Sequence, residues 1–88
     1  MIKKEFTIKN EMGLHARVAS KFVQLTNGFL SDVELCYNND YIDGKSIMCI
    51  ISMSIPKDGV ITLTVKGPDE EEAVEKLEHF FSSDIMNV

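Results

Sequence analysis

The residues with the clearest chemical potential lie at positions 13–17, which read GLHAR. His15 falls where a loop gives way to a predicted helix, so it lies near the helix N-cap, beside backbone N–H groups that have no partner within the helix. The positive end of the helix dipole disfavours an imidazolium, and a neutral imidazole is a nucleophile that can hold a group covalently. A phosphoryl group on His15 would meet those N–H donors and the guanidinium of Arg17 together. These residues therefore predict a site for a transient phosphohistidine, with Gly13 letting the backbone bend away.

A histidine at the start of a helix is also often only a cap or a surface residue, and local chemistry alone leaves that alternative open. His79 provides the contrast within the same chain. It lies inside the last predicted helix, with no loop–helix junction and no adjacent arginine, so we assign it no chemistry.

Ser46 repeats the arrangement at a second predicted helix, because it is a plausible N-cap that follows Lys45. A phosphate there would find N–H donors and would add a charge of about −1.5 to −2 to that face. The alternative is a plain N-cap serine that stabilises the helix by roughly 1 kcal/mol. Met48 is open to two interpretations as well, because a methionine at helical spacing can pack in the core or can form a pliable partner surface.

Composition narrows the functions that these residues could serve. The chain has 88 residues, 44% of them apolar and 26% charged, which predicts one small globular domain over residues 1–88. Nine basic and 14 acidic residues give a net charge of −5, which is a poor match to nucleic acid. The apolar stretches are far shorter than the roughly 20 residues that cross a bilayer, and the N-terminus has no signal-peptide pattern. We expect a cytoplasmic protein.

Metal and cofactor chemistry finds little support. Cys36 and Cys49 form no CxxC pair and have no clustered histidines near them, and the acidic run at residues 70–72 points its carboxylates in diverging directions. The sequence has no glycine-rich nucleotide motif and no HExxH motif. We expect no metal site and no bound cofactor, with both cysteines reduced.

The elements that must position the site follow from hydrophobic periodicity. Alternation predicts strands and 3.6-residue spacing predicts helices, in the order strand, helix, strand, strand, helix, strand, helix. The predicted spans are a strand at 2–8, a helix at 16–26, strands at 33–37 and 41–42, a helix at 47–53, a strand at 61–65 and a helix that opens at 67–71. This order predicts an α+β fold, an open-faced sandwich with helices on one face of an antiparallel sheet.

The motifs at residues 13–17 and 45–48 (KSIM) together resemble HPr, the family of histidine-containing phosphocarriers of the bacterial sugar phosphotransferase system. The resemblance covers essentially the whole chain in motif order, spacing and length. It implies four antiparallel strands with three helices on one face. It further implies that His15 accepts a phosphoryl group on Nδ1 from enzyme I, which phosphoenolpyruvate charges. Arg17 would steady the group before it passes to a sugar-specific IIA component.

The second motif resembles the Gram-positive branch of the family. There, the serine that matches Ser46 is phosphorylated by an HPr kinase/phosphorylase, which weakens exchange with enzyme I and promotes binding to the regulator CcpA. Ile47 and Met48 match part of the family's partner-binding surface. The resemblance thus implies a phosphoryl carrier rather than a free-standing enzyme, and we expect it to be a monomer.

Three positions depart from the family pattern. Val18 stands where a proline usually follows the arginine, Met12 replaces a small polar residue, and the hairpin at residues 39–40 is more acidic than usual. None removes a group that would do the chemistry, although valine relaxes a helical turn that proline would preset. Two alternatives stay open: a Crh-like regulator that acts through phospho-Ser46, whose group usually lacks the active histidine, and a small ligand-binding domain without phosphate chemistry.

Overall fold

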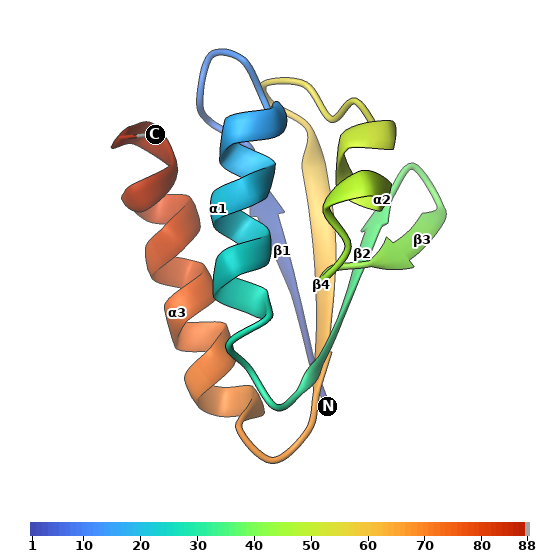
Figure 1. Cartoon of the computed structure of the whole chain (residues 1–88), viewed down its shortest axis with the longest axis vertical. Helices are drawn as coiled ribbons and strands as arrows, with labels where there is room; N and C mark the ends of the chain where they lie inside the picture. The colour runs from blue at the N-terminus through green and yellow to red at the C-terminus, as the bar shows by residue number, and fades with distance from the viewer. Residues whose placement is uncertain (88) are drawn as a thin grey trace.

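A computed structural model describes residues 1–87 of the chain (Figure 1). Four strands and three α-helices alternate in the predicted order, and a short 3₁₀ helix follows them. The elements are β1 (Ile2–Thr7), α1 (Ala16–Thr26), β2 (Asp32–Tyr37), β3 (Asp40–Asp43), α2 (Ile47–Ser52), β4 (Val60–Lys66), α3 (Glu70–Ser82) and η1 (Asp84–Asn87). Within residues 1–87, no helix is long and apolar enough to cross a membrane.

The strands form one antiparallel sheet in the order β1-β4-β2-β3, with all three helices on the same side of it (Figure 1). The predicted open-faced sandwich is therefore confirmed. β4 is a central strand, because it pairs with β1 from Ile2↔Val65 to Thr7↔Val60 and with β2 on its other side. β1 and β3 are the two edge strands. The loop that carries His15 runs directly out of edge strand β1.

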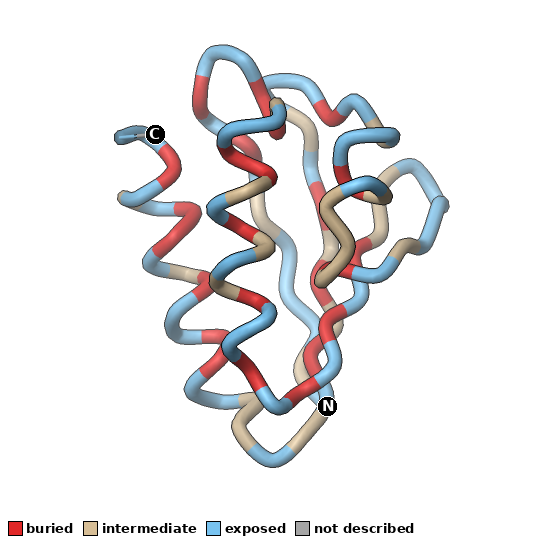
Figure 2. The backbone as a smooth tube through the Cα atoms, viewed as in Figure 1, coloured by how far each residue is buried: buried red, intermediate tan, exposed pale blue. Residues whose placement is uncertain are grey.

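The core lies between the sheet and the helices, where the alternating and helical patterns bury their apolar residues (Figure 2). Helical spacing predicts a buried side for α3, and the structure buries the five residues that this spacing gives: Ala73, Val74, Leu77, Phe80 and Phe81. The spacing of residues 16–26 predicts a buried stripe of Ala19, Phe22, Val23 and Thr26, and the structure departs from it at two residues. Val18 is completely buried, whereas Val23 is only half-buried. α1 packs against α2 as well as α3, and its buried side begins in the first helical turn.

The η1 turn has no counterpart in the sequence-based prediction. Its Ile85 is buried in the common core, while Met86 remains exposed. A single turn has too few residues to show a helical period, so periodicity could not predict it. The turn borders the loop before His15, because Ile85 and Met86 line one hollow together with Met12 and His15.

Asp69 ties the start of α3 to the segment before β2. Its carboxylate accepts hydrogen bonds from the Ser31 hydroxyl and from the backbone N–H groups of Leu30 and Ser31, the latter two at 2.9 Å. The Ser31 hydroxyl and then the Leu30 N–H lower the pKa of Asp69 below its ordinary 3.8, because they stabilise the charged carboxylate.

This lowered pKa makes a prediction for stability in acid. A carboxyl whose pKa is lower in the folded state contributes stability that is complete above its unfolded pKa and is lost as the pH falls through the folded value. We expect Asp69→Asn to flatten the fall in unfolding free energy below about pH 4, as measured by urea denaturation between pH 6 and pH 2. An acid limb as steep in the variant as in the wild type would contradict this role.

Candidate functional site

His15 is the N-cap residue of α1. Its backbone is extended, with φ −74° and ψ 175°, and its carbonyl accepts the first helical hydrogen bond, from the Ala19 N–H at 2.8 Å. Its ring nitrogen Nδ1 accepts a hydrogen bond from the backbone N–H of Arg17 at 3.3 Å. An acceptor nitrogen carries no proton, so the neutral ring holds its proton on Nε2 and directs the Nδ1 lone pair at the helix N-terminus. Nδ1 thus faces the backbone donors at the start of α1, which are donors that can also bind an anion.

The loop before His15 is fastened to the segment that follows α2. The Leu14 N–H donates to the Ile55 carbonyl at 2.9 Å, and the Leu14 side chain is buried. Gly13 has a positive φ of 67°, and a Cβ on it would lie 2.3 Å from the Ile55 carbonyl oxygen. Only glycine fits this close approach without displacing backbone. The loop that carries the histidine is therefore held against the segment that follows α2.

Asn10 completes this loop. Its side-chain Nδ2 donates to the Gly13 carbonyl at 2.6 Å, and the Gly13 N–H in turn donates to the Asn10 carbonyl at 3.1 Å. The residue is buried, and the sequence analysis did not single it out. An asparagine ahead of a glycine turn is a signal for this kind of side-chain-to-backbone bond. The reciprocal pair keeps the turn closed.

Arg17 and Val18 occupy the first turn of α1 with opposite roles. Arg17 is exposed, and no carboxylate within residues 1–87 forms an ion pair with it. Its guanidinium is free to meet an anion at the helix start. Val18 instead points into the core, and its N–H precedes the first helical bond, which begins at Ala19. Val18 therefore contributes a buried side chain and leaves the α1 hydrogen bonds intact.

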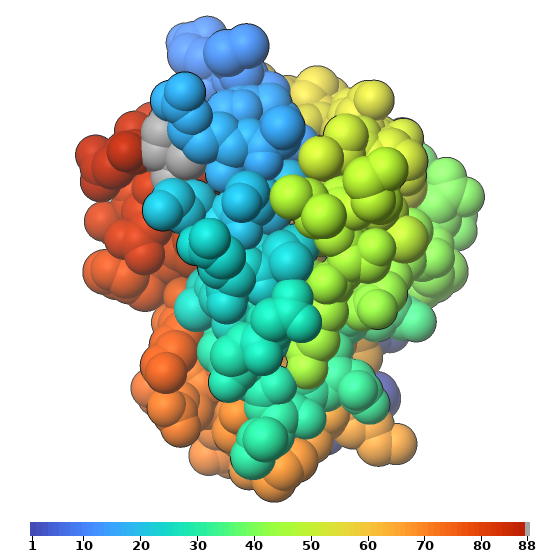
Figure 3. Space-filling view, in the orientation of Figure 1, coloured from blue at the N-terminus to red at the C-terminus, as the bar shows by residue number. Residues whose placement is uncertain are grey.

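Two shallow hollows flank the histidine. One, of about 340 Å³, separates His15 from the end of α2 and is lined by Met12, Leu14, His15, Ile51, Ser54, Ile55 and Pro56. The other, of about 240 Å³, lies toward η1 and includes Met12, His15 and Met86. Figure 3 shows the start of α1 beside the end of α2 on one face of the molecule. Met12 lines both hollows, so it belongs to the site although the sequence analysis noted it only as a departure.

The exposed side of α2 continues this surface with apolar residues. Met48 is 74% exposed and Ile51 is 39% exposed, whereas Ile47 is half-buried and packs against the core. Met48 and Ile51 are three residues apart, so they lie on the same face of the helix. Ile47 and Met48 are the residues that the resemblance implies for this surface, and Ile51 is an addition that its spacing from Met48 could have indicated. Together, Met12, Met48 and Ile51 form what we call the apolar rim of the histidine site.

Ser46 is the N-cap of α2, and its Oγ accepts from the Cys49 N–H at 3.4 Å. The preceding Lys45 does not approach this hydroxyl with its charge, because its Nζ donates to the Phe29 carbonyl at 2.9 Å. The Thr26 hydroxyl and the Asn27 side chain, at the end of α1, donate to the carbonyls of Gly44 and Lys45. Ser46 therefore lies by the end of α1, and His15 lies by its start. An 11-residue helix spans roughly 16 Å, so the structure does not bring these two residues together.

The structure also shows the surroundings of the histidine, the acidic residues and the cysteines to which the sequence assigned no chemistry. His79 is exposed on α3 and lies 3.3 Å from an Asp84 carboxylate oxygen. Glu70, in the acidic run, contacts the chain's amino terminus, which is the main reason that its pKa is lowered. No group of three or more His, Cys, Asp or Glu side chains within residues 1–87 could hold a metal ion. Cys36 and Cys49 are both free thiols.

Taken together, the fold and the site define a class of protein: a small α+β open-faced sandwich that displays a histidine N-cap and an exposed arginine beside an apolar rim. Residues 2–83 match a family model described as the PTS HPr component phosphorylation site. The chain is 39% identical over 77 residues to the phosphocarrier protein HPr of Cupriavidus necator, covering 88% of this chain and 86% of the relative. The chain belongs to the HPr family of phosphocarrier proteins.

Solved structures agree with this assignment. HPr-C-His from Thermoanaerobacter tengcongensis is 38% identical, covers 97% of this chain and 96% of its own, and superimposes with a TM-score of 0.92. The Bacillus subtilis catabolite repression protein Crh, in a structure described as a swapped dimer, is 36% identical with a TM-score of 0.74 and covers 96% of this chain and 97% of its own. Both named groups that the sequence resembles thus share this fold.

Proposed function

We propose that this chain carries a phosphoryl group on Nδ1 of His15, received from phosphorylated enzyme I and passed to sugar-specific IIA components. The observation that carries the proposal is the hydrogen bond from the Arg17 N–H to Nδ1. It directs the lone pair that must attack phosphorus toward the α1 N-terminus. As the P–Nδ1 bond forms, the bond from phosphorus to enzyme I breaks, and Nε2 keeps its proton. The Arg17 N–H then donates to a phosphoryl oxygen instead of to Nδ1.

The exposed Arg17 side chain and the helix dipole stabilise the charge that arrives. A guanidinium forms short, strong hydrogen bonds with phosphoryl oxygens, and an unpaired arginine need not break an ion pair to do so. The apolar rim gives protein partners a desolvated contact around the transferring group. Its two methionines suit a surface that must fit more than one partner, because their side chains are flexible and polarizable.

Ser46 is the proposed regulatory site, phosphorylated by an HPr kinase/phosphorylase of the Gram-positive type and then bound by CcpA. About one α1 length separates it from His15, so its phosphate would act on a docked partner rather than on the imidazole. Ile47 and Met48, directly after it, would join the partner contact. We further propose a cytoplasmic monomer without metal or cofactor, although related proteins have been solved as dimers.

Ser46→Asp is expected to slow phosphoryl exchange with enzyme I by about tenfold or more, because it adds negative charge to the docking face. The rate is measured by rapid-quench transfer from phosphorylated enzyme I at two salt concentrations. Ser82→Asp adds the same charge at an exposed position at the end of α3, outside α2 and outside the apolar rim, and should leave the rate unchanged. Equal rates for all three proteins would show that Ser46 acts only as a cap.

The test of the carrier function is incubation with enzyme I and labelled phosphoenolpyruvate, followed by measurement of how the bound phosphate is lost. A phosphohistidine is lost in acid and survives alkali, and we expect that behaviour here. No label on the protein, together with ATP-dependent phosphorylation of Ser46, would instead support the Crh-like alternative. If neither enzyme I nor the ATP-dependent kinase phosphorylated the protein, the remaining alternative would be a small ligand-binding domain without phosphate chemistry.

A further inference from the structure

Three of the chain's five methionines lie around the His15 site. Met12 is 74% exposed and lines both hollows beside the histidine. Met86, on η1, is 58% exposed and lines the hollow on that side. Met48 completes the set as an exposed residue of the apolar rim on α2. Thioether side chains that are open to solvent therefore lie on both sides of the proposed nucleophile.

The other two methionines have different surroundings. Met53, at the end of α2, is half-buried and packs against the core. Met1 is exposed, but it precedes β1, and the histidine loop begins after that strand, whose six residues span roughly 20 Å. Figure 1 shows the N-terminus and the start of α1 toward opposite ends of the molecule. Neither of these methionines lines a hollow beside His15.

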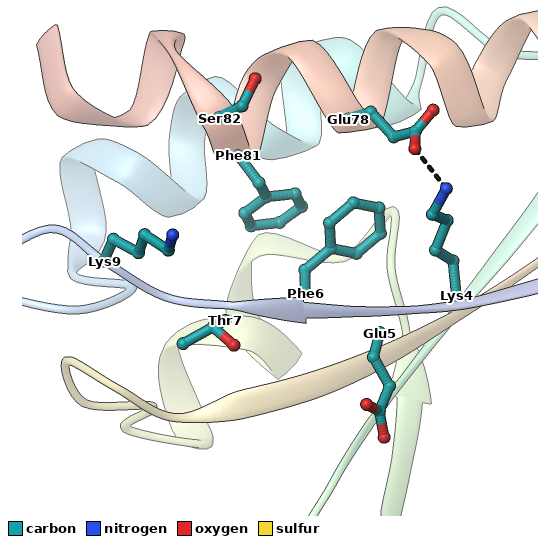
Figure 4. A pocket seen from close by; sticks show the side chains of 8 residues that line it. All are labelled: Lys4, Glu5, Phe6, Thr7, Lys9, Glu78, Phe81 and Ser82. Carbon is teal, nitrogen blue, oxygen red and sulfur yellow. Dashed lines mark hydrogen bonds and ion pairs between the residues drawn. The ribbon is translucent and has the colours of Figure 1, made fainter.

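A third hollow, of about 400 Å³, has an aromatic centre instead. It lies along β1 and α3, where Phe6 and Phe81 stack with their ring centroids 4.7 Å apart (Figure 4). None of the methionines among residues 1–87 lines it. Because mild oxidants attack the sulfur of cysteine and methionine, they would change the surface around His15 and leave this aromatic hollow as it is.

A peroxide converts a methionine thioether to a sulfoxide. The sulfur attacks one oxygen of hydrogen peroxide, an S–O bond forms as the O–O bond breaks, and the other oxygen leaves as water. Sulfur loses two electrons, which the peroxide gains. The product is polar, so a partner that docks on it must remove water from a group that gains no hydrogen bond in an apolar contact. Oxidation of the apolar rim therefore weakens docking around His15.

We propose that Met12 is an oxidation site through which hydrogen peroxide slows phosphoryl transfer at His15. Met12 is the principal site because it alone lines both hollows, and Met48 and Met86 are secondary ones. This inference rests on the proposed carrier function. The change is reversible, because methionine sulfoxide reductases return the thioether. The rate of exchange with enzyme I would then follow the oxidation state of a surface residue that forms no bond to phosphorus.

The test uses the full chain with Cys36→Ser and Cys49→Ala, because both cysteines are free thiols that peroxide also oxidises. After peroxide treatment, peptide mass spectrometry should find oxygen on Met12 before Met53. Transfer from phosphorylated enzyme I, measured by rapid quench at low protein concentration, should slow by about fivefold or more and recover after treatment with methionine sulfoxide reductases A and B. The urea midpoint should stay the same, because Met12 is exposed.

Met12→Leu keeps an apolar side chain without sulfur, so its rate should change by less than about twofold on peroxide treatment. Met12→Gln should be slow before any treatment, because its side chain is polar. Met53→Leu is the matched control and should slow on oxidation as much as the parent protein.

Equal rates before and after oxidation, an equal loss in Met12→Leu, or a loss that accompanies a lower urea midpoint would each overturn the proposal. The carrier function is judged separately, on the untreated protein. Absence of label there would overturn the carrier function and this inference together, whereas normal labelling before oxidation and unchanged labelling after it would overturn this inference alone.

Discussion

His15→Ala is expected to abolish phosphorylation by enzyme I and phosphoenolpyruvate while leaving the fold intact. The imidazole Nδ1 is the nucleophile in the proposed transfer, and no neighbouring side chain of the hollows beside it, such as Met12 or Ser54, can replace a neutral imidazole at this position. The loss should exceed a thousandfold in the initial rate of label incorporation. Circular dichroism and the urea midpoint should change little, because His15 is half-buried at the end of a helix rather than in the core.

The chain offers a matched control for this result. His79→Ala removes the other histidine, which is exposed on α3 and contacts Asp84, and it should incorporate label at the wild-type rate. Arg17→Ala should keep the labelled site but slow its formation, because the guanidinium stabilises the group without bonding to phosphorus. Label that persists in His15→Ala would contradict the assignment of the phosphorylated residue.

Gly13→Ala is expected to have the largest effect on stability among small substitutions in the site. Its Cβ would lie 2.3 Å from the Ile55 carbonyl oxygen, and its φ of 67° is a conformation that alanine adopts only at a cost. Strained backbone of this kind costs about 1–3 kcal/mol, and the collision with backbone adds to it. We expect a loss of about 3 kcal/mol or more in unfolding free energy, measured by urea denaturation, which is a large share of the total for a small domain.

Gly28→Ala is the control for that measurement. At Gly28 the nearest atom to an added Cβ is the Leu25 carbonyl oxygen at 3.3 Å, and the backbone does not adopt the left-handed conformation. We expect a change below about 1 kcal/mol there. If both variants lost the same free energy, the contact between the histidine loop and Ile55 would not be a source of stability. Gly13→Ala should also slow phosphoryl transfer under conditions in which it remains folded, because displacing Leu14 moves the adjacent His15.

Local sequence patterns were sufficient to predict the open-faced sandwich and the position of His15 at the start of α1. Alternation and helical spacing depend on neighbours in sequence, and the boundaries of α1 follow from them. Alternation in β1 places Lys4 on the same side of the strand as Ile2 and Phe6, where it is the one exception to an apolar pattern. The structure shows that its charge pairs with Glu78 on α3, which lies 74 residues away in sequence.

Contacts between segments that are far apart in sequence could not be predicted, because local patterns depend only on neighbours in sequence. Asp69 occupies the N-cap position of α3, where a sequence would predict a bond within its own helix, but its carboxylate binds Leu30 and Ser31 instead. The apolar rim was only partly predicted. Met12 comes from a loop without any period, and its position beside Ile51 depends on how the loop is fastened to Ile55. The sequence therefore predicts which residues can do chemistry better than which residues surround them.

The pairing of β1 with β4 has a consequence for the order of folding. Ile2 lies opposite Val65, so the first strand to be synthesised gains its sheet neighbour only when most of the chain is available. Pairings that close such long loops form slowly, because the entropy of closure is lost before the contacts form. The histidine loop leaves β1 and is anchored at Ile55, so it too depends on late segments. On the ribosome, a partly synthesised chain would contain His15 but not the geometry around it, and the carrier would become competent only as its last third emerged.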